Sequence, residues 1–323
     1  RLSMPGIPRE RVDALLKRAI HAPSSHNTQP WLFEIDGNRV RLYADGRRAL
    51  PVNDPDDREL TISCGAALMT LRVAAAADGL GTEVEVLPDA EDPDLLATLT
   101  LDPGTEPDAA LAALAPEIER RRTYRKRFAE TSVGADRVEA LASAAAQEDV
   151  RLKTVEGDTA RGRLAELVSE GDQAQWADRS WRRELAAWMH PRREGDGLTM
   201  PGLVAPVARM VVRSFDMGGG VAARDSEIAE HSPLLAVLGT QSDEPRDWIA
   251  AGQGLQRVLL AASREGLQAS YLNQPVQVAH LRHKLQSLVS GAGVPQILLR
   301  LGEPEEDLPP APRRPVEEVE IGA

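Results

Sequence analysis

The chain has 323 residues, a formal net charge of −12, 42% apolar residues and 27% charged residues. This composition is typical of a globular protein with a sizeable core. The acidic balance argues against nucleic acid and anionic membrane as partners. With Cys64 as the one cysteine, neither an intramolecular disulfide nor a Cys-rich metal site is expected. We find neither a signal-peptide core nor an apolar run near the roughly 20 residues that span a bilayer, and we therefore expect a cytoplasmic protein.

Apolar periodicity and turn residues predict helices and short strands in the first third of the chain. The expected elements are, in order, a helix over 8–20, a β-hairpin over 31–43, a helix over 58–78, strands over 84–87 and 95–101, and a helix after Pro107.

An internal repeat organises the chain. Residues 64–80 align without a gap on residues 251–267, and both glycines and the leucine after the second glycine are kept. A shorter match joins 11–15 to 137–141. The offsets are 187 and 126, so the second copy is longer by 61 residues between these anchors (187 − 126 = 61). The alternative is that Ala- and Leu-rich helices resemble one another by chance.

The surplus lies between about residues 150 and 250 and holds three of the five tryptophans. Trp181, Leu185 and Trp188 have helical spacing, so they form one apolar face, and Trp176 lies just before them. One interpretation is a helix that completes an ordinary core. The other is a lid-like insertion at about 170–225 that excludes water from a cofactor.

A turn rich in polar side chains, Ala22-Pro-Ser-Ser-His-Asn-Thr-Gln-Pro-Trp31, follows the first helix. Its hydroxyl, amide and backbone groups suit the edge of a planar heteroaromatic ligand, which presents alternating donors and acceptors. A capped connection between a helix and a strand is the alternative interpretation.

This turn resembles the signature of the FMN-dependent nitroreductase family, in which a helix ends in Ala-Pro-Ser-Ser-x-Asn-x-Gln-Pro-Trp and leads into a strand. Residues 62–68, 296–304 and 313–319 are also similar to family segments. With its duplication, the chain most resembles the Acg-type branch. The resemblance implies an α+β fold of two antiparallel sheets flanked by helices, in which two halves, 1–117 and 118–323, mimic a dimer within one chain.

A basic segment, residues 119–128, precedes the start of the second copy. Taken on charge alone it could be a solvated face. In nitroreductases an Arg-x-Ser-x-Arg element grips the FMN phosphate, and Arg121, Thr123 and Arg125 fit this spacing with Thr in place of Ser. Guanidinium groups suit phosphate because they donate in a planar fork. The first half has the serine-rich turn and the second half has the arginines, so the resemblance implies one FMN per chain.

The predicted cofactor-binding residues come from the polar turn, the basic segment, the segment after residue 271 and the C-terminal segment. They are Pro23, Ser24, Ser25, Asn27, Gln29, Arg121, Arg122, Thr123, Arg125, Asn273, Gln274, Arg313 and Arg314. We predict no catalytic acid or base and no metal, since His280 and His283 lack a third ligand nearby.

The resemblance implies an oxidoreductase related to NAD(P)H nitroreductases, with hydride passing through flavin N5 to a nitro- or quinone-type acceptor. The rival hypothesis is an FMN-sequestering protein in which Trp176, Trp181 and Trp188 belong to a lid. A third is dehydrogenation or oxygen-dependent flavin chemistry on the same scaffold. The expected partner is a small-molecule acceptor, and further self-association of the monomer is left open.

Overall fold

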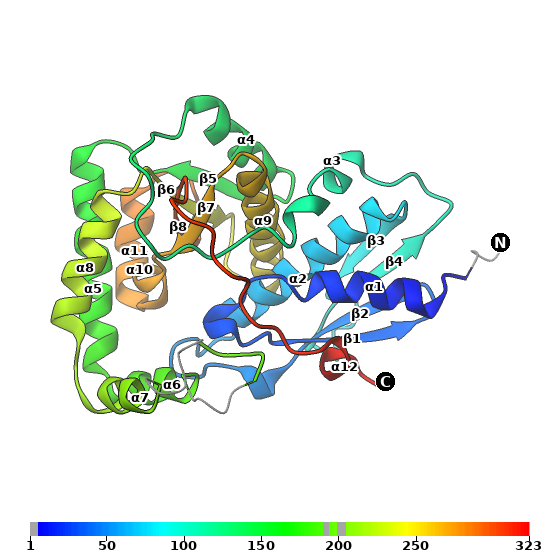
Figure 1. The fold of residues 1–323 in the computed structure, drawn as a ribbon, viewed down its shortest axis with the longest axis horizontal. Helices are drawn as coiled ribbons and strands as arrows, with labels where there is room; N and C mark the ends of the chain where they lie inside the picture. The colour runs from blue at the N-terminus through cyan, green and yellow to red at the C-terminus, as the bar shows by residue number, and fades with distance from the viewer. Residues whose placement is uncertain (1–5, 190–193, 199–204, 323) are drawn as a thin grey trace.

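The computed structural model describes residues 6–189, 194–198 and 205–322. Figure 1 shows two lobes side by side, with the chain's first third in one and most of the remainder in the other. The elements of the first lobe are α1 (Arg9–Ala19), η1 (Ser25–Asn27), β1 (Trp31–Asp36), β2 (Arg39–Ala44), η2 (Gly46–Arg48), α2 (Arg58–Ala77), β3 (Gly81–Val86), β4 (Leu95–Asp102), α3 (Ala109–Ala112) and η3 (Ala115–Glu117).

The second lobe begins after the basic segment. Its elements are α4 (Ala135–Ala146), β5 (Arg151–Thr154), α5 (Asp158–Ala177), α6 (Arg179–Ala187), α7 (Ala205–Ser214), α8 (Gly218–Glu230), β6 (Leu234–Thr240), α9 (Pro245–Arg264), β7 (Gln268–Tyr271), α10 (Gln274–Gln277), α11 (Ala279–Leu288) and β8 (Val294–Gly302), and the chain continues to α12 (Val316–Val319).

Each lobe has an antiparallel four-stranded sheet, and the two sheets have the same topology. The strand orders are β1-β2-β4-β3 and β5-β6-β8-β7. Each sheet therefore places its third strand at the edge and its fourth strand inside. This agreement confirms the α+β fold and the internal duplication that the repeat predicted.

Helices α2 and α9 pack against each other at the centre of the molecule, and both are 20 residues long. They cross at Gly65 and Gly252, which are also 187 residues apart. A Cβ on Gly65 would lie 2.4 Å from the Ile249 carbonyl oxygen, and one on Gly252 would lie 2.0 Å from the Ile62 carbonyl oxygen. The contact is thus repeated across a pseudo-two-fold axis, and only glycine allows the helices to approach so closely.

The two lobes differ most in the connection between their first two strands. β1 and β2 are joined by a tight turn at Gly37, whereas four helices, α5 to α8, lie between β5 and β6. The predicted insertion at 170–225 falls within this connection. Helix α5 packs with α8, and its apolar side chains form a core with inward residues of β6 and β8 (Leu164, Val168, Leu235, Val237, Leu298).

The C-terminal segment leaves β8 and returns to the first lobe, where α12 lies beside β1 (Figure 1). The Ile321 amide donates to the Phe33 carbonyl oxygen over 2.7 Å, and Phe33 bridges to Glu320. The two lobes are therefore joined by the last residues as well as by the central helix pair.

Helix α2 corrects one sequence-based expectation. By length and composition it is apolar enough to cross a bilayer, with a mean hydropathy of 1.6 in its most apolar window. Within the protein, 89% of that window is buried. Its apolar character follows from its position as a core helix between the sheet of the first lobe and α9.

Candidate functional site

The polar turn after α1 has an unusual backbone. His26, Asn27 and Gln29 have positive φ angles of 51°, 52° and 51°. Non-glycine residues rarely adopt this conformation, and such strain is found most often at binding and catalytic sites. The Ser24 hydroxyl accepts the Gln29 amide hydrogen over 3.0 Å, which closes the turn.

Gln29 fixes the turn to neighbouring segments through its buried side chain. Its side chain is completely buried, and its amide nitrogen donates to the Gly195 carbonyl oxygen over 2.7 Å. Its amide oxygen accepts from the Arg314 backbone over 2.9 Å. The Arg314 guanidinium donates to the Gln29 carbonyl oxygen over 2.7 Å. Reciprocal hydrogen bonds between Gln29 and Arg314 thus hold the backbone of the turn in place.

Arginines from distant parts of the chain meet at the end of α1. Arg121 donates to the His21 carbonyl oxygen over 3.1 Å. Arg313 donates to the carbonyl oxygens of Ile20 (2.8 Å), His21 (3.1 Å) and Ala22 (3.2 Å). The carbonyl end of a helix carries partial negative charge, which accounts for their attraction to this place. Arginines of the basic and C-terminal segments therefore lie beside the polar turn.

Arg121 and Arg125 both retain unused donors. Arg121 is buried, and its Nε has no hydrogen-bond partner among the described residues. Arg125 forms neither a hydrogen bond nor an ion pair with any residue that the structure describes. Tyr271 of β7 faces both arginines closely enough to interact electrostatically with them. A buried donor without an acceptor is unfavourable, so the cluster fits an anionic ligand.

The charges in the cluster also act on one another. Burial lowers the pKa of Arg313 to about 9, with a further contribution from the charges of Arg121 and Arg122. Neighbouring protein groups partly desolvate Arg125 and lower its pKa, although its side chain remains exposed to solvent. For His26, burial, followed by the charge of Arg125, lowers the pKa to about 4, so His26 is neutral at pH 7. An anion bound here would relieve this repulsion.

Most of the other predicted residues of the turn and the basic segment have partners within the protein. Ser25 donates to Glu59 Oε2 over 3.0 Å, and Asn27 donates to the Pro312 carbonyl oxygen over 2.9 Å. Arg122 donates to the Leu308 carbonyl oxygen over 2.9 Å, and Thr123 pairs with Ala269 through a backbone bridge. Pro23 is buried at the start of the turn.

Asn273 and Gln274 make supporting contacts in the second lobe. The Asn273 side-chain oxygen accepts the Leu298 amide hydrogen over 2.8 Å. The Gln274 amide nitrogen lies 3.1 Å from both Asp172 and Asp225, on α5 and α8. These side chains hold the start of α10 against β8 and the inserted helices.

Two of the predicted tryptophans lie in the inserted helices, and Trp188 directly follows α6. Trp176 and Trp181 pack edge to face with ring centroids 5.2 Å apart, and the Trp181 indole donates to Asn53 Oδ1 over 3.0 Å. Trp188 is 7% exposed. The inserted segment meets the polar turn through its backbone, because Gly197 donates to the Asn27 carbonyl oxygen over 3.3 Å and Gly195 accepts from Gln29.

Glu59, Gln277 and Tyr271 were not predicted and lie next to the predicted residues. Glu59 is the one acidic residue of the largely apolar helix α2, and it accepts from both Ser25 and Gln277. Its negative charge in this sequence was the signal that could have indicated it. Nothing in the sequence pattern indicated Gln277 or Tyr271.

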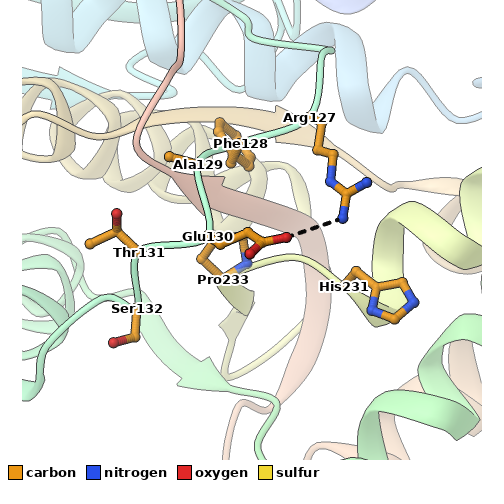
Figure 2. A pocket seen from close by; sticks show the side chains of 8 residues that line it. All are labelled: Arg127, Phe128, Ala129, Glu130, Thr131, Ser132, His231 and Pro233. Atoms are coloured by element: carbon orange, nitrogen blue, oxygen red, sulfur yellow. Dashed lines mark ion pairs between the residues drawn. The ribbon is translucent and has the colours of Figure 1, made fainter.

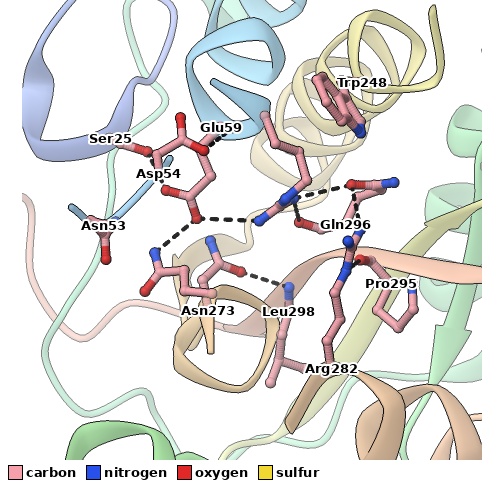
Figure 3. A network of polar contacts seen from close by, with 12 residues as sticks. Ser25, Asn53, Asp54, Glu59, Trp248, Asn273, Arg282, Pro295, Gln296 and Leu298 are labelled. Carbon is pink, nitrogen blue, oxygen red and sulfur yellow. Dashed lines mark hydrogen bonds and ion pairs between the residues drawn. The ribbon is translucent and has the colours of Figure 1, made fainter. Parts of the chain in front are cut away.

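A polar network joins α2 to the second lobe (Figure 3). Arg58 donates to the Gln296 carbonyl oxygen over 2.8 Å, and Gln296 donates to Asp243 over 2.9 Å. Asp243 also pairs with Arg282 over 2.6 Å. Burial opposes ionisation of Asp243, but its hydrogen bonds to Arg282, Gln296 and Trp248 outweigh it and hold its pKa well below the usual range. The network fixes the position of α2 relative to β8 and α11.

A separate hollow lies between residues 127–132 and the end of α8 (Figure 2). Arg127 and Glu130 face each other there with a nitrogen–oxygen distance of 3.5 Å, and both side chains are largely exposed. None of the predicted site residues lines this hollow, so we assign the candidate site to the polar turn and the arginine cluster instead.

Comparison with solved structures places the fold. A nitroreductase-type protein from Anabaena variabilis aligns with a TM-score of 0.55 at 10% identity, over 92% of this chain and 88% of that chain. The FMN-dependent nitroreductase NfnB of Mycobacterium smegmatis, solved in complex with NADPH, aligns with a TM-score of 0.40 at 20% identity, over 60% of this chain and 89% of that chain. The first comparison defines the class of protein: a nitroreductase-like fold that extends over nearly the whole chain.

Curated relatives are more similar in sequence. A protein of Mycobacterium tuberculosis named as a putative NAD(P)H nitroreductase is 34% identical over 96% of this chain and 91% of its own length. The protein of the same name designated Acg, also from Mycobacterium tuberculosis, is 31% identical over 95% of this chain and 94% of its own length. No family model matches the chain. The chain belongs to the nitroreductase family, in the branch that includes Acg.

Proposed function

We propose that the chain binds one FMN between its two lobes and acts as an oxidoreductase that uses NAD(P)H to reduce a nitro- or quinone-type acceptor. In this proposal Arg121, Arg122 and Arg125 hold the phosphate, and the turn at Ser24–Asn27 holds the ring. The names of the relatives support the choice of NAD(P)H as reductant. A cytoplasmic location, where this reductant is available, is part of the proposal.

One observation carries the proposal: unused guanidinium donors lie beside a strained polar turn contributed by the other half of the chain. Arg121 Nε has no partner among the described residues, and three residues of the turn, His26, Asn27 and Gln29, have positive φ angles. An FMN phosphate would satisfy the arginine donors in the bidentate geometry that guanidinium groups favour.

The protein's residues bind and orient the cofactor in this account, and FMN supplies the hydride chemistry when it is bound. His26 is neutral at pH 7 because burial lowers its pKa to about 4, so it adds no further charge beside the arginines. Tyr271 presents an aromatic side chain to the same place, and burial raises its pKa, which keeps its hydroxyl protonated.

We further propose that the functional halves divide near residue 118, as 1–117 and 118–323, and that the monomer contains a whole site. Arg121, which follows residue 118, donates over 3.1 Å to the carbonyl oxygen of His21, the residue directly before the turn. A second subunit is then not needed to complete the site.

Anaerobic addition of NADPH or NADH to the FMN-loaded protein tests the activity. We expect the yellow colour of the oxidised flavin to bleach, and a nitroaromatic or quinone acceptor to restore it. FMN that stays oxidised with both nucleotides but bleaches with dithionite would contradict the reductase function.

That contrary result would support a second candidate, an FMN-sequestering protein. Contacts between the inserted segment and the turn favour it: Gly195 accepts from Gln29, and Asp196 pairs with Arg48 over 2.6 Å. A segment fixed in this way would limit access to a ligand on the turn. In the sequestering protein, Arg48→Ala should speed FMN release, whereas the same variant of a freely open reductase should release FMN at an unchanged rate.

A further inference from the structure

Glu59 is a buried carboxyl group directly behind the polar turn. It lies in the first turn of α2, is 5% exposed, and appears beside Ser25 in Figure 3. Ser25 donates to its Oε2 over 3.0 Å, and Gln277 donates to its Oε1 over 2.8 Å. It is not needed as a helix cap, because Asp54 already accepts the Glu59 and Leu60 amide hydrogens over 3.0 and 2.9 Å.

The charged and titratable groups around Glu59 come from three elements. Arg58 of α2 lies 3.7 Å from its Oε1, Asp54 precedes the helix, and Tyr271 faces it from β7. Burial has the largest effect and raises the pKa of Glu59, while the charge of Arg58 and the hydrogen bonds from Gln277 and Ser25 oppose it. A proton on Glu59 is therefore easier to add than on an exposed glutamate.

A chain of hydrogen bonds determines which oxygen of Glu59 can hold that proton. The indole nitrogen of Trp181 can only donate, so Asn53 Oδ1, 3.0 Å away, must accept. The Gln175 amide nitrogen lies 3.5 Å from the same oxygen and 2.7 Å from Gln277 Oε1, so it donates and Gln277 Oε1 accepts. The donor and acceptor roles along this series of hydrogen bonds are therefore set by the Trp181 indole, which can only donate.

It follows that Gln277 must present its amide nitrogen to Glu59. Glu59 Oε1 is then always an acceptor, and an added proton can lie only on Oε2, which faces Ser25. Without the proton, the Ser25 hydroxyl donates to Glu59 and offers lone pairs to the other side. With the proton, Glu59 donates to Ser25, and the serine hydrogen is free to donate to a ligand. One proton is added, and one hydrogen bond reverses direction.

We infer that Glu59 is a positioning residue that decides whether Ser25 donates to or accepts from the ring bound at the polar turn. The inference rests on the proposed function, since it needs a ring on the turn. It extends that function because the proton on Glu59 sets whether the site donates or accepts a hydrogen bond. The hydrogen bonds through Gln277, Gln175 and Asn53 connect Glu59 to Trp181 of the inserted helices.

The test is FMN affinity measured by fluorescence quenching from pH 5 to 9 in wild type and in Glu59→Gln. The glutamine mimics the protonated acid at every pH, because its amide nitrogen would face Ser25 as a permanent donor. Wild type should show a dependence of up to about tenfold per pH unit, the limit for one proton. Glu59→Gln should lose this component. The phosphate of FMN titrates equally in both proteins, so the difference between their profiles reports Glu59.

Two further variants make the result decisive. Ser25→Ala should also lose the pH component, and it serves if Glu59→Gln does not fold. Glu117→Gln is the matched control, because Glu117 is a buried glutamate that accepts a serine hydroxyl, that of Ser263, over 2.6 Å. It should keep the wild-type profile. Identical profiles for wild type, Glu59→Gln and Ser25→Ala would overturn the inference while FMN binding stands. A wild-type protein that binds no FMN at any pH would overturn the proposed function itself.

Discussion

Arg125 and Arg313 show two uses of arginine in one cluster. Arg313 donates to the carbonyl oxygens at the end of α1, whereas the guanidinium of Arg125 has no partner among the described residues. An arginine that bonds the backbone stabilises the fold. An arginine held near the site without an acceptor is available to a ligand, and we attribute this role to Arg125.

Replacing Arg125 should therefore affect binding and leave stability unchanged. We expect Arg125→Ala to weaken FMN binding roughly 10- to 100-fold, because a hydrogen bond to a charged group contributes about 1.5–3 kcal/mol. Isothermal titration with FMN and thermal unfolding measure the two effects. Arg127→Ala is the control, because Arg127 is two residues away and its side chain is 74% exposed. Equal affinities for the two variants would refute the assignment.

Asp172 of α5 lies close to Asp225 of α8, and both contact the Gln274 amide. Burial, then the hydrogen bond and charge of Asp225, raises the pKa of Asp172 to about 8, and Gln274 opposes the shift. Arg300 lies near enough to Asp225 to interact with it. The folded protein holds a proton here that the unfolded chain releases near pH 4. Stability from this group is therefore complete below pH 4 and is lost as the pH rises to about 8.

Asp172→Asn should flatten this dependence, because asparagine donates to Asp225 at every pH. We expect the melting temperature of wild type, relative to the variant, to fall between pH 5 and 8. Glu166→Gln, an exposed position on the same helix, should follow wild type. If the melting temperatures of Asp172→Asn and wild type change in parallel across this range, Asp172 holds no proton in the folded protein.

Individual residues of the site were only partly predictable. The family resemblance led us to expect the Arg121 segment and the turn with Ser25 near each other, and Arg121 donates to the His21 carbonyl oxygen just before that turn. Whether Arg313 or Arg314 would face the cluster could not be read from the sequence, because an irregular segment has no periodicity that assigns its side chains to a face. The polarity of the Glu59 chain depends on side chains from four separate segments, which local pattern does not bring together.

At the scale of elements, the α2–α9 pair determines how the two lobes meet. Gly65 and Gly252 allow the helices to cross in contact with each other's carbonyl groups. The repeat aligned these two helices and their glycines with each other, but it did not predict that the helices would cross there. Strand β5, with four residues, has too short a pattern to predict, so the place at which the surplus residues enter the second lobe was not fixed more closely than about 150–250.

Gly252→Ala should destabilise the protein, since the new Cβ would lie 2.0 Å from the Ile62 carbonyl oxygen. Forced overpacking of this kind costs about 1–3 kcal/mol or more. Denaturant unfolding measures the loss. Gly162→Ala in helix α5 is the control: nothing lies within 4 Å of its added Cβ, and it should be neutral or stabilise by up to about 1 kcal/mol. Equal stability of the two variants would show that the crossing is not tight.

For the whole molecule, the sequence predicted the α+β class, the duplication and the pairing of turn and arginines across the two halves. It did not predict that the C-terminal segment returns to pack on β1, or that four helices replace a hairpin turn. Those features depend on contacts between residues far apart in the chain. They make the two halves unequal, although their sheets share one topology.

This inequality underlies the central claim, which is a single cofactor site per chain. The turn with Ser24 and Asn27 occurs once, in the first half, and the cluster with Arg121 and Arg125 occurs once, after it. The most direct measurement is the number of FMN molecules bound per chain at saturation, by absorbance and phosphorus analysis of the gel-filtered protein. We predict one. A protein that binds none, or one that binds two, would contradict the account.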